Sequence, residues 1–362
     1  MNYSGIHPTV KVIRKNIPRP WKCLFSLCFF IFLSCNEFSK EKTFTNPIRE
    51  GADPWVFQKG DDYYYCASSG GGIAISKSSK LTEHGVFQKV WDAPDQGWNS
   101  ANIWAPEIHY IAGHWYIYYA AGEKPGGPFI HQKSGVLKSH GNDPFGPYED
   151  LGMLYTGDDI TDPESVKWAI DLTPFEHEGE LYAIWSGWEE NRETDRTAQH
   201  LYIAIMSDPA TISSNRVKIS SPEESWETGG ELDLNEGPQV LKRNNLTFII
   251  YSTRESWLKE YRMGQLKLKE ASVDPLLPKN WVKTGPVFLG NETVHGVGHC
   301  SFATSPDGTE DWILYHSKKG TEPGWDRDIR LQPFQWREDG SPDFGNPVSI
   351  NEVLPVPSGE KE

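Results

Sequence analysis

Cysteine and metal-binding motifs are scarce in this chain, which has only five cysteines in 362 residues. Three of them lie within the first 35 residues, so only Cys66 and Cys300 belong to the rest of the chain. No Cys-x-x-Cys pair and no His-Glu-x-x-His motif is present, and these absences exclude the usual zinc signatures. One disulfide and two buried thiols remain as alternatives, and the strand patterns around both cysteines favour buried thiols.

Positive charge is also in short supply. The chain has 35 lysines and arginines against 50 aspartates and glutamates, a formal net charge of −15. Five of the basic residues lie in residues 1–34, which contain no acid, so the remainder carries a net charge of −20. Such an acidic protein is not expected to bind nucleic acid by neutralising phosphates. The charge fits a neutral, hydroxyl-rich ligand or simply solubility.

Long helical periodicity is absent, and the apolar run at residues 24–35 is too short to cross a bilayer comfortably. The run follows a basic segment and ends in FLSC, so residues 1–35 are predicted to be a signal peptide. FLSC resembles a bacterial lipobox, which predicts lipid attachment at Cys35. Residues 36–46 are then a polar tether. The protein is expected to be exported and to meet a membrane only through the lipid anchor, whereas the oligomeric state is not predicted.

Aromatic residues, glycine and proline are abundant, with 15 tryptophans, 33 glycines and 26 prolines. A turn followed by an alternating aromatic strand recurs five times, at intervals of 53 to 66 residues, as GDDYYYCA (60–67), GHWYIYYA (113–120), GELYAIWS (179–186), NLTFIIYS (245–252) and TEDWILYH (309–316). A period of this size with such strands predicts a propeller with one blade per repeat. We therefore expect an all-β, five-bladed β-propeller that forms one domain over residues 47–362.

A polar residue precedes each repeat by 6 to 10 positions: Asp53, Glu107, Asp171, Glu236 and His299. The innermost strands of a propeller line its central channel. Residues at equivalent points of these strands are therefore expected to meet at one mouth of that channel. Each of these residues could by itself be an ordinary residue at the start of a strand, but their recurrence predicts a common site.

Three of these residues, Asp53, Asp171 and Glu236, are acids, and each is followed by a proline within three positions. Acids that gather near one axis repel each other, so at least one pKa is expected to rise. Such a separation of pKa values keeps one carboxyl protonated as an acid and leaves another ionised as a base. Two carboxyls with divided roles suit the cleavage of a glycosidic bond.

Five segments together carry a resemblance to a known family: GADPWV, IWAPEIHY with GHWYIYYAA, WAIDLTPF with GELYAIWSG, NEGPQVL and GVGHCSF. In order and spacing they resemble glycoside hydrolase family 43, over residues 46 to 355. That family comprises five-bladed propellers and includes α-L-arabinofuranosidases, β-xylosidases and arabinanases, which invert the anomeric configuration. The resemblance implies that Asp53 is the general base, that Glu236 is the general acid, and that Asp171 orients the acid and tunes its pKa.

The resemblance also implies substrate contacts for His299 in GVGH and Arg330 in DIRLQPF. The alternatives are a core histidine and a salt bridge at the rim. Trp104 and Trp185 are candidates to stack on sugar, although aromatic residues here can equally pack between blades. No cofactor is expected to be required, and a structural calcium ion near His299 is considered without assigned ligands. Long loops at 191–199, 221–234 and 318–328 are further candidates for substrate contact.

The sequence favours an exo-acting α-L-arabinofuranosidase on plant polysaccharides or oligosaccharides, with a β-xylosidase or endo-arabinanase of the same family as alternatives. Val297 and Cys300 stand where members of the family often carry proline and asparagine. Neither difference removes a catalytic group, and both bear on the shape of the pocket and on the choice of substrate. The related β-fructosidases are disfavoured because the chain has WAIDL and NEGP in place of their motifs. A non-catalytic glycan-binding propeller is disfavoured because all three acids are present. Glu107 is expected to be structural, in contact with a backbone or basic group.

Overall fold

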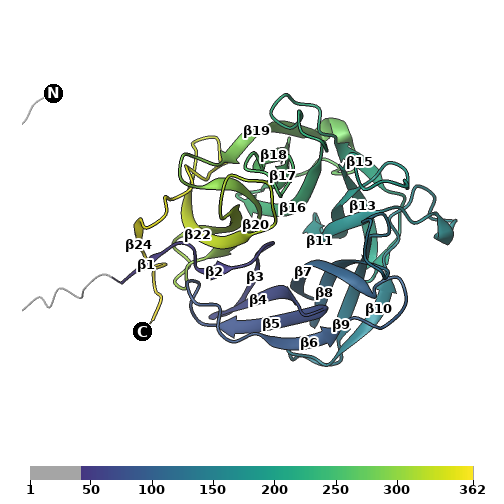
Figure 1. Cartoon of the computed structure of the whole chain (residues 1–362), viewed down its shortest axis with the longest axis horizontal. Coiled ribbons are helices and arrows are strands. Elements are labelled where there is room, and N and C mark those ends of the chain that lie inside the picture. Colours follow the sequence, from purple (N-terminus) through teal and green to yellow (C-terminus); the bar gives the residue numbers. More distant parts are fainter. Residues whose placement is uncertain (1–41, 362) are drawn as a thin grey trace, which may run out of the picture. The chain divides into compact units, whose positions relative to one another are not determined.

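The computed structural model describes residues 42–361, and within this range nearly all regular structure is β. Five small sheets surround a central axis, which confirms the predicted five-bladed β-propeller (Figure 1). No helix in the described part is long and apolar enough to span a membrane. The predicted signal peptide, Cys35 and the first residues of the predicted tether lie outside the described residues.

Blades 1, 2 and 4 are four-stranded antiparallel sheets whose first strand in the chain lies innermost. Blade 1 consists of β3 (Trp55–Lys59), β4 (Asp62–Ser69), β5 (Gly72–Ser78) and β6 (Gln88–Asp92). Blade 2 consists of β7 (Ala101–Ile111), β8 (His114–Gly122), β9 (Lys133–Ser139) and β10 (Tyr148–Met153). Blade 4 consists of β16 (Asn235–Arg243), β17 (Leu246–Thr253), β18 (Arg262–Leu268) and β19 (Trp281–Leu289).

Blades 3 and 5 each have a fifth strand. Blade 3 consists of β11 (Ala169–His177), β12 (Glu180–Gly187), β13 (His200–Asp208), β14 (Thr211–Ile212) and β15 (Val217–Ser220). Blade 5 consists of β20 (His295–Thr304), β21 (Asp311–Lys318), β22 (Arg327–Trp336), β23 (Pro342–Asp343) and β2 (Arg49–Glu50). Two 3-10 helices, η1 (Pro163–Ser165) and η2 (Pro278–Asn280), lie in the connections before β11 and β19.

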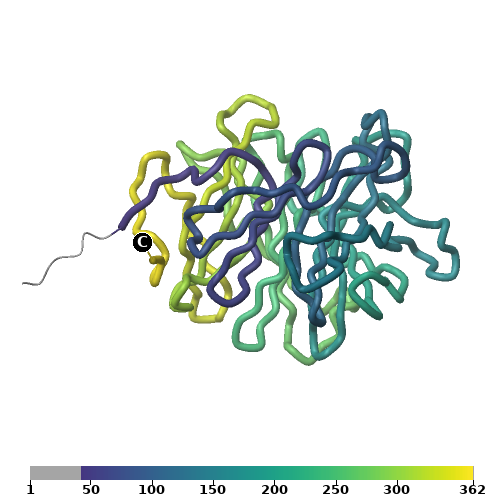
Figure 2. The backbone as a smooth tube through the Cα atoms, turned by 90° about the horizontal axis from the view of Figure 1, so that it is seen from below, coloured from purple at the N-terminus to yellow at the C-terminus, as the bar shows by residue number. Residues whose placement is uncertain are grey.

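The two ends of the described chain close the ring. Strand β2, from the start of the chain, pairs with β22 of blade 5, and Arg49 lies opposite Ile329. Strand β1 (Thr43–Thr45), within the segment expected to be a tether, pairs with β24 (Val353–Pro355), and the two ends run side by side in Figures 1 and 2. Inner strands β20 and β3 are also in contact. The last blade therefore joins the first through backbone hydrogen bonds.

Five of the seven hydrophobic clusters in residues 42–361 lie between neighbouring blades, one at each interface. The repeated aromatic positions explain this arrangement, because alternate residues of a strand face opposite sides of its sheet. Tyr116 of β8 packs against blade 3, whereas Tyr119, three residues later, packs against blade 1. Cys66 and Cys300 belong to two of these clusters and are buried free thiols, as predicted.

Blade 1 differs from the ungapped alignment of the repeats by one residue. Tyr63 packs against blade 5, whereas its aligned partner Tyr116 packs toward the following blade. Tyr64 is the residue of blade 1 that packs toward the following blade. The reason is the turn between β3 and β4, where Gly60 takes the place that Ala112 has in blade 2.

Every blade carries a left-handed residue at the same end of its innermost strand. These residues are Asp53 (φ 49°), Ala105 (φ 40°), Asp171 (φ 55°), Gly237 (φ 56°) and His299 (φ 46°). In blades 2 to 5 the pairing register shifts at this residue, which marks a β-bulge. A left-handed conformation costs a non-glycine residue on the order of 1–2 kcal/mol. Four of the five blades thus hold a strained residue at one mouth of the channel.

The sequence predicted that Glu236 and Glu107 lie at equivalent points of their strands, and the positions of the bulges show that they do not. Glu236 lies one residue before the left-handed Gly237, whereas Glu107 lies two residues after the left-handed Ala105. Glu236 therefore stays at the mouth of the channel. Glu107 lies one layer deeper, level with Thr173 and Gln239, and the two acids are not equivalent.

Candidate active site

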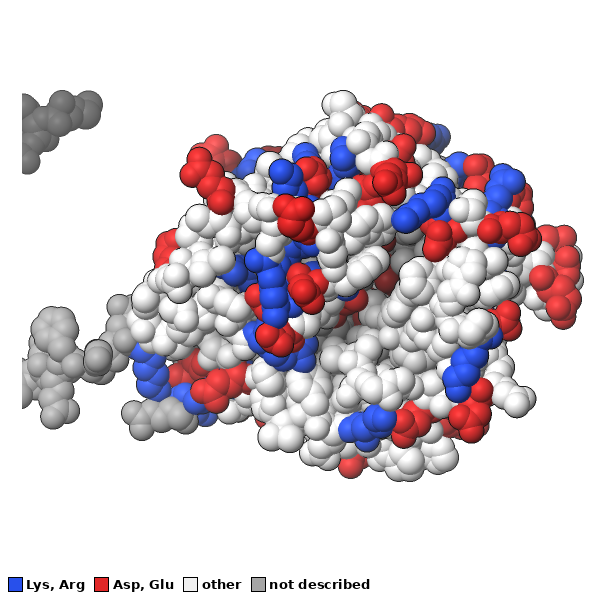
Figure 3. All heavy atoms as spheres, viewed as in Figure 1, with Lys and Arg blue, Asp and Glu red and all other residues white. Residues whose placement is uncertain are grey.

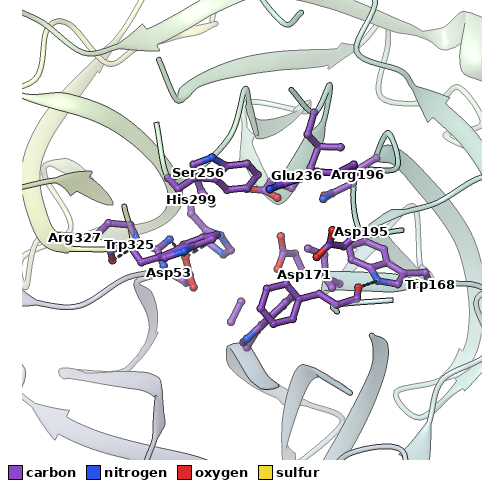
Figure 4. Close-up of a pocket in the computed structure, with 17 residues that line it drawn as sticks. Asp53, Trp168, Asp171, Asp195, Arg196, Glu236, Ser256, His299, Trp325 and Arg327 are labelled. Atoms are coloured by element: carbon purple, nitrogen blue, oxygen red, sulfur yellow. Dashed lines mark hydrogen bonds and ion pairs between the residues drawn. The ribbon is translucent and has the colours of Figure 1, made fainter. Parts of the chain in front are cut away.

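One pocket of about 630 Å³ opens where the bulges gather. Figure 3 shows this face hollowed near its middle, and Figure 4 shows side chains from different blades converging on the pocket. Its lining includes the expected residues Asp53, Asp171, Glu236, His299 and Trp104. The volume is typical of a site for a small ligand.

Asp53 is surrounded by basic side chains from blade 5. Its Oδ1 lies 3.2 Å from His316 Nδ1, 3.4 Å from His299 Nδ1 and 3.4 Å from Arg327 Nη1. Burial favours the neutral acid, but His299, Arg327 and His316 together outweigh it and hold the pKa of Asp53 well below its usual range. Asp53 is therefore an ionised carboxylate at every pH at which the protein would work.

Glu236 and Asp171 form a buried pair with the opposite tendency. Burial raises the pKa of Glu236 to about 7, and the charge of Asp53 adds to the rise. Burial also raises the pKa of Asp171, whose Oδ2 accepts a hydrogen bond of 2.9 Å from the backbone nitrogen of Gly237. The Gly237 N–H and the nearby His299 lower the pKa of Asp171, but burial and the charge of Glu236 outweigh them, so both carboxyls hold a proton more readily than a free acid does.

Aromatic side chains form two sides of the pocket. On one side, Trp104 packs edge-on against Phe129, and Trp168 donates a 2.8 Å hydrogen bond to the Phe129 carbonyl. Trp168 stacks on Trp188, with ring centroids 4.5 Å apart and planes 2° from parallel. On the other side, the ring centroids of Trp257 and Trp325 lie 5.2 Å apart. Tryptophan faces of this kind pack well against the C–H groups of a sugar ring.

Two predicted contact residues do not reach the pocket. Trp185 is fully buried in the core between blades 2 and 3, because its strand position points between the blades. In the same WSGW segment, Trp188 is the residue that supports the pocket, through Trp168. Arg330 is also buried and donates to the Val348 carbonyl at 2.6 Å.

Two arginines line the pocket, Arg196 and Arg327, and Arg327 is the first residue of β22. Strand β22 is the third strand outward in blade 5, so only its end approaches the channel. Arg327 lies within the loop 318–328, which the sequence marked as a candidate for substrate contact. Its place in that loop was the signal that could have distinguished it from Arg330.

Below the pocket, Glu107 joins the inner strands of several blades. Its Oε1 accepts a hydrogen bond from Gln239, and its Oε2 lies 3.1 Å from His109 Nε2. Burial raises the pKa of Glu107 to about 8, despite hydrogen bonds from Thr173 and Gln239, and burial lowers the pKa of His109 to about 3. Between these values both groups are uncharged, so they form a neutral hydrogen bond in place of an ion pair.

Glu107→Gln is expected to be tolerated near pH 5 and to stabilise the protein relative to wild type as pH rises. The folded pKa of Glu107 lies above its unfolded value. Its stability contribution is therefore complete below about pH 4.5 and is lost as pH approaches 8. Glutamine keeps both hydrogen bonds and does not titrate. Thermal unfolding at pH 5 and pH 8.5 should show a difference in Tm that grows with pH.

The control is Glu107→Ala, which leaves Gln239 and His109 without their partner. It should cost about 2–4 kcal/mol at pH 5, and less at pH 8.5, where wild type has itself lost the contribution of a neutral Glu107. A Tm difference between Glu107→Gln and wild type that stays constant from pH 5 to 8.5 would contradict a neutral Glu107.

Within residues 42–361, no group of three or more histidine, cysteine, aspartate or glutamate side chains is arranged to hold a metal ion. His299 contacts Asp53 and lies beside the His316 ring, and calcium prefers six to eight oxygen ligands. We therefore assign no metal ligand to His299 and derive no step from calcium.

Below about pH 7 the pocket thus holds an ionised carboxylate and a protonated carboxyl group together. Asp53 can accept a proton from water, and Glu236 can donate one to a leaving oxygen. The two carboxyl groups differ in protonation because their surroundings differ. Basic groups surround Asp53, whereas Glu236 is buried.

Comparison with known proteins finds a matching family model and several similar proteins. The sequence model described as glycosyl hydrolases family 43 matches residues 44–342. An "Extracellular exo-alpha-(1->5)-L-arabinofuranosidase" of Streptomyces avermitilis is 35% identical over 334 residues, covering 88% of this chain and 66% of the relative. A protein of the same description from Streptomyces chartreusis is 32% identical over 289 residues, covering 77% of this chain and 84% of the relative.

"Alpha-L-arabinofuranosidase 43" of Humicola insolens is 32% identical over 319 residues, covering 83% of this chain and 63% of the relative. The chain therefore spans 66% and 63% of the length of the Streptomyces avermitilis and Humicola insolens proteins. Among solved structures, an α-L-arabinofuranosidase from Lactobacillus brevis superposes with a TM-score of 0.76 at 31% identity, covering 85% of this chain and 98% of that structure.

Proposed function

This chain belongs to glycosyl hydrolases family 43, and on that basis we propose that it is an inverting glycosidase that removes terminal α-L-arabinofuranosyl groups. The observation that carries the proposal is the pair of carboxyl groups in one pocket, with Asp53 ionised and Glu236 protonated near neutral pH. The substrate class is a pentose-containing plant polysaccharide or oligosaccharide. The names of the relatives at 32–35% identity support arabinofuranose as the sugar.

In the proposed reaction, Asp53 removes a proton from water while that water attacks the anomeric carbon. Glu236 gives its proton to the glycosidic oxygen as the bond between that oxygen and the anomeric carbon breaks. The electron pair of that bond stays on the leaving oxygen, and no covalent sugar intermediate forms. Asp171 accepts a hydrogen bond from the Gly237 backbone and so holds the residue next to Glu236 in place.

The aromatic sides of the pocket support a monosaccharide unit as the bound group. Trp104, Phe129 and Trp168 form one side and Trp257 and Trp325 the other, and together they can enclose a single pentose ring. Enclosure at a chain end is what exo action requires, and this favours exo action over the endo alternative.

We also propose that the protein is exported, because two of the relatives are described as extracellular. Lipid attachment at Cys35 remains a prediction from the sequence alone. A lipid anchor would hold the catalytic domain at a membrane surface, and residues 36–41 with the following segment would set its distance from that surface.

A single proton NMR time course tests both the sugar and the stereochemistry. The purified protein is given 4-nitrophenyl α-L-arabinofuranoside or 4-nitrophenyl β-D-xylopyranoside. We expect the arabinoside to be cleaved at least tenfold faster and β-L-arabinofuranose to appear before mutarotation. Preferential xyloside cleavage would support the β-xylosidase alternative, and α-L-arabinofuranose as the first product would contradict the roles of Asp53 and Glu236.

A further inference from the structure

Tyr261 is in direct contact with Glu236, although no repeat or motif in the sequence selects it. It lies immediately before β18, at the end of the loop 254–261 whose residues Ser256 and Trp257 line the pocket. The Tyr261 side chain is completely buried, and its hydroxyl donates a 2.8 Å hydrogen bond to Glu236 Oε1. Among the described residues, no hydrogen bond to Glu236 Oε2 accompanies it.

The ring of Tyr261 also reaches the surroundings of the base. It stacks on His316, with centroids 5.4 Å apart and planes at 12°. His316 Nδ1 lies 3.2 Å from both the backbone nitrogen and Oδ1 of Asp53. One side chain therefore contacts Glu236 directly and supports the residue that holds Asp53.

Gly298 is the residue that makes room for this ring. A Cβ atom at Gly298 would come within 2.1 Å of the Tyr261 ring, so no other residue fits without moving it. The glycine of GVGH immediately before His299 thus has a spatial reason, and its backbone φ is not in the left-handed region. The pocket is built around Tyr261 in this position.

We infer that Tyr261 is a positioning residue for proton donation by Glu236. Its hydrogen bond occupies Oε1, which leaves Oε2 as the oxygen that carries the proton toward the substrate. When the Oε2 proton moves to the leaving oxygen, negative charge forms on the carboxylate, and the hydrogen bond from Tyr261 strengthens. The inference rests on the proposed function, because it requires Glu236 to be the acid.

Tyr261 remains a donor throughout the working range of pH. Burial, with the nearby charge of Glu236, raises the pKa of Tyr261 well above its usual value, so the hydroxyl stays protonated. The same hydrogen bond lowers the pKa of Glu236 against the larger effect of burial. Tyr261 thus stabilises the carboxylate product of proton transfer without ionising itself.

The test is Tyr261→Phe, which keeps the ring, its stacking on His316 and its fit beside Gly298. With an arabino-oligosaccharide substrate, kcat should fall about 10- to 100-fold, the size expected for one hydrogen bond to a charged group. The alkaline limb of kcat/KM should move to higher pH, because the carboxylate has lost a donor. With 2,4-dinitrophenyl α-L-arabinofuranoside, whose leaving group needs no proton, kcat should change less than threefold.

The matched control is Tyr315→Phe, which deletes another buried hydroxyl, one that donates to Gln332 at 2.9 Å. The Tyr315→Phe variant should leave the alkaline limb of kcat/KM at its wild-type pH. An unshifted limb in Tyr261→Phe, or an equal loss of kcat for both leaving groups, would overturn the inference.

A second variant covers the case in which Tyr261→Phe does not fold. Site-specific 3-fluorotyrosine at position 261 keeps the hydroxyl and makes it a stronger donor, so the alkaline limb should move to lower pH. A shift in the other direction, or none, would again overturn the inference. Glu236→Gln separates the two proposals: if that variant keeps the wild-type alkaline limb, the assignment of the acid fails, whereas a limb lost there but unmoved by both Tyr261 variants removes only the role of Tyr261.

Discussion

Replacing Asp53 by asparagine is expected to lower kcat by about 10²- to 10⁴-fold, the range in which general acid–base catalysis contributes. Asparagine has nearly the same shape and tolerates the left-handed backbone at this position, where φ is 49°. It cannot accept a proton from water. The loss should therefore appear in kcat, measured on an arabinofuranoside at the optimal pH, while the fold stays intact by circular dichroism.

Azide provides a positive control for the same site. Asp53→Gly suits the left-handed backbone and opens space beside the anomeric carbon. Azide should restore activity in this variant and give an arabinofuranosyl azide of inverted configuration, because azide attacks without needing a base. Asp62→Asn, which breaks a surface ion pair with Lys77, is the matched control and should keep wild-type kcat. Wild-type kcat in Asp53→Asn would refute the assignment of the base.

Glu236→Gln is expected to lower kcat/KM by about 10²- to 10⁴-fold on arabino-oligosaccharides, whose leaving oxygen needs a proton. The loss should be far smaller on a 2,4-dinitrophenyl arabinofuranoside. The pH profile should change as well. Burial raises the pKa of Glu236 to about 7, so wild-type activity falls as pH rises through 7 and the acid loses its proton. Glutamine has no proton to lose, and this alkaline limb should disappear.

Glu107→Gln is the matched control, because Glu107 is also a buried, protonated glutamate near the axis but does not line the pocket. It should retain both the alkaline limb and the dependence on the leaving group. A Glu236→Gln variant that loses activity equally on both substrates would place the role of Glu236 elsewhere than in proton donation.

The repeats were enough to predict the propeller, because aromatic residues at a fixed offset from a turn must pack between neighbouring sheets. The three candidate acids followed from the same repeats, and the pocket does bring Asp53, Asp171 and Glu236 together. Side-chain direction was harder to predict. Trp185 and Trp188 are three residues apart in one motif, yet only the second supports the pocket.

What the sequence could not show is how bulges shift the register. Glu107 lies two residues after the left-handed Ala105 and therefore one layer deeper than Asp53, the left-handed residue of blade 1, although both acids precede their repeats by nearly equal distances. Tyr261 lies just before β18, outside the repeated pattern, so the repeats could not select it. Arg327 lies in a loop that the sequence marked only as a whole, and the structure shows that this residue contacts Asp53.

The closure of the ring by β2 and β22 also sets the order in which the protein can become active. Asp53 lies near the start of the described chain, but the three side chains around it come from positions 299, 316 and 327. During synthesis, Asp53 lacks these three neighbours until nearly the whole chain has left the ribosome. Contacts so distant in sequence form slowly, because the entropy of closing a long loop must be overcome first. Enzymatic activity is therefore a readout of the final step of folding, and fragments that lack blade 5 should fold some blades without ever cleaving a substrate.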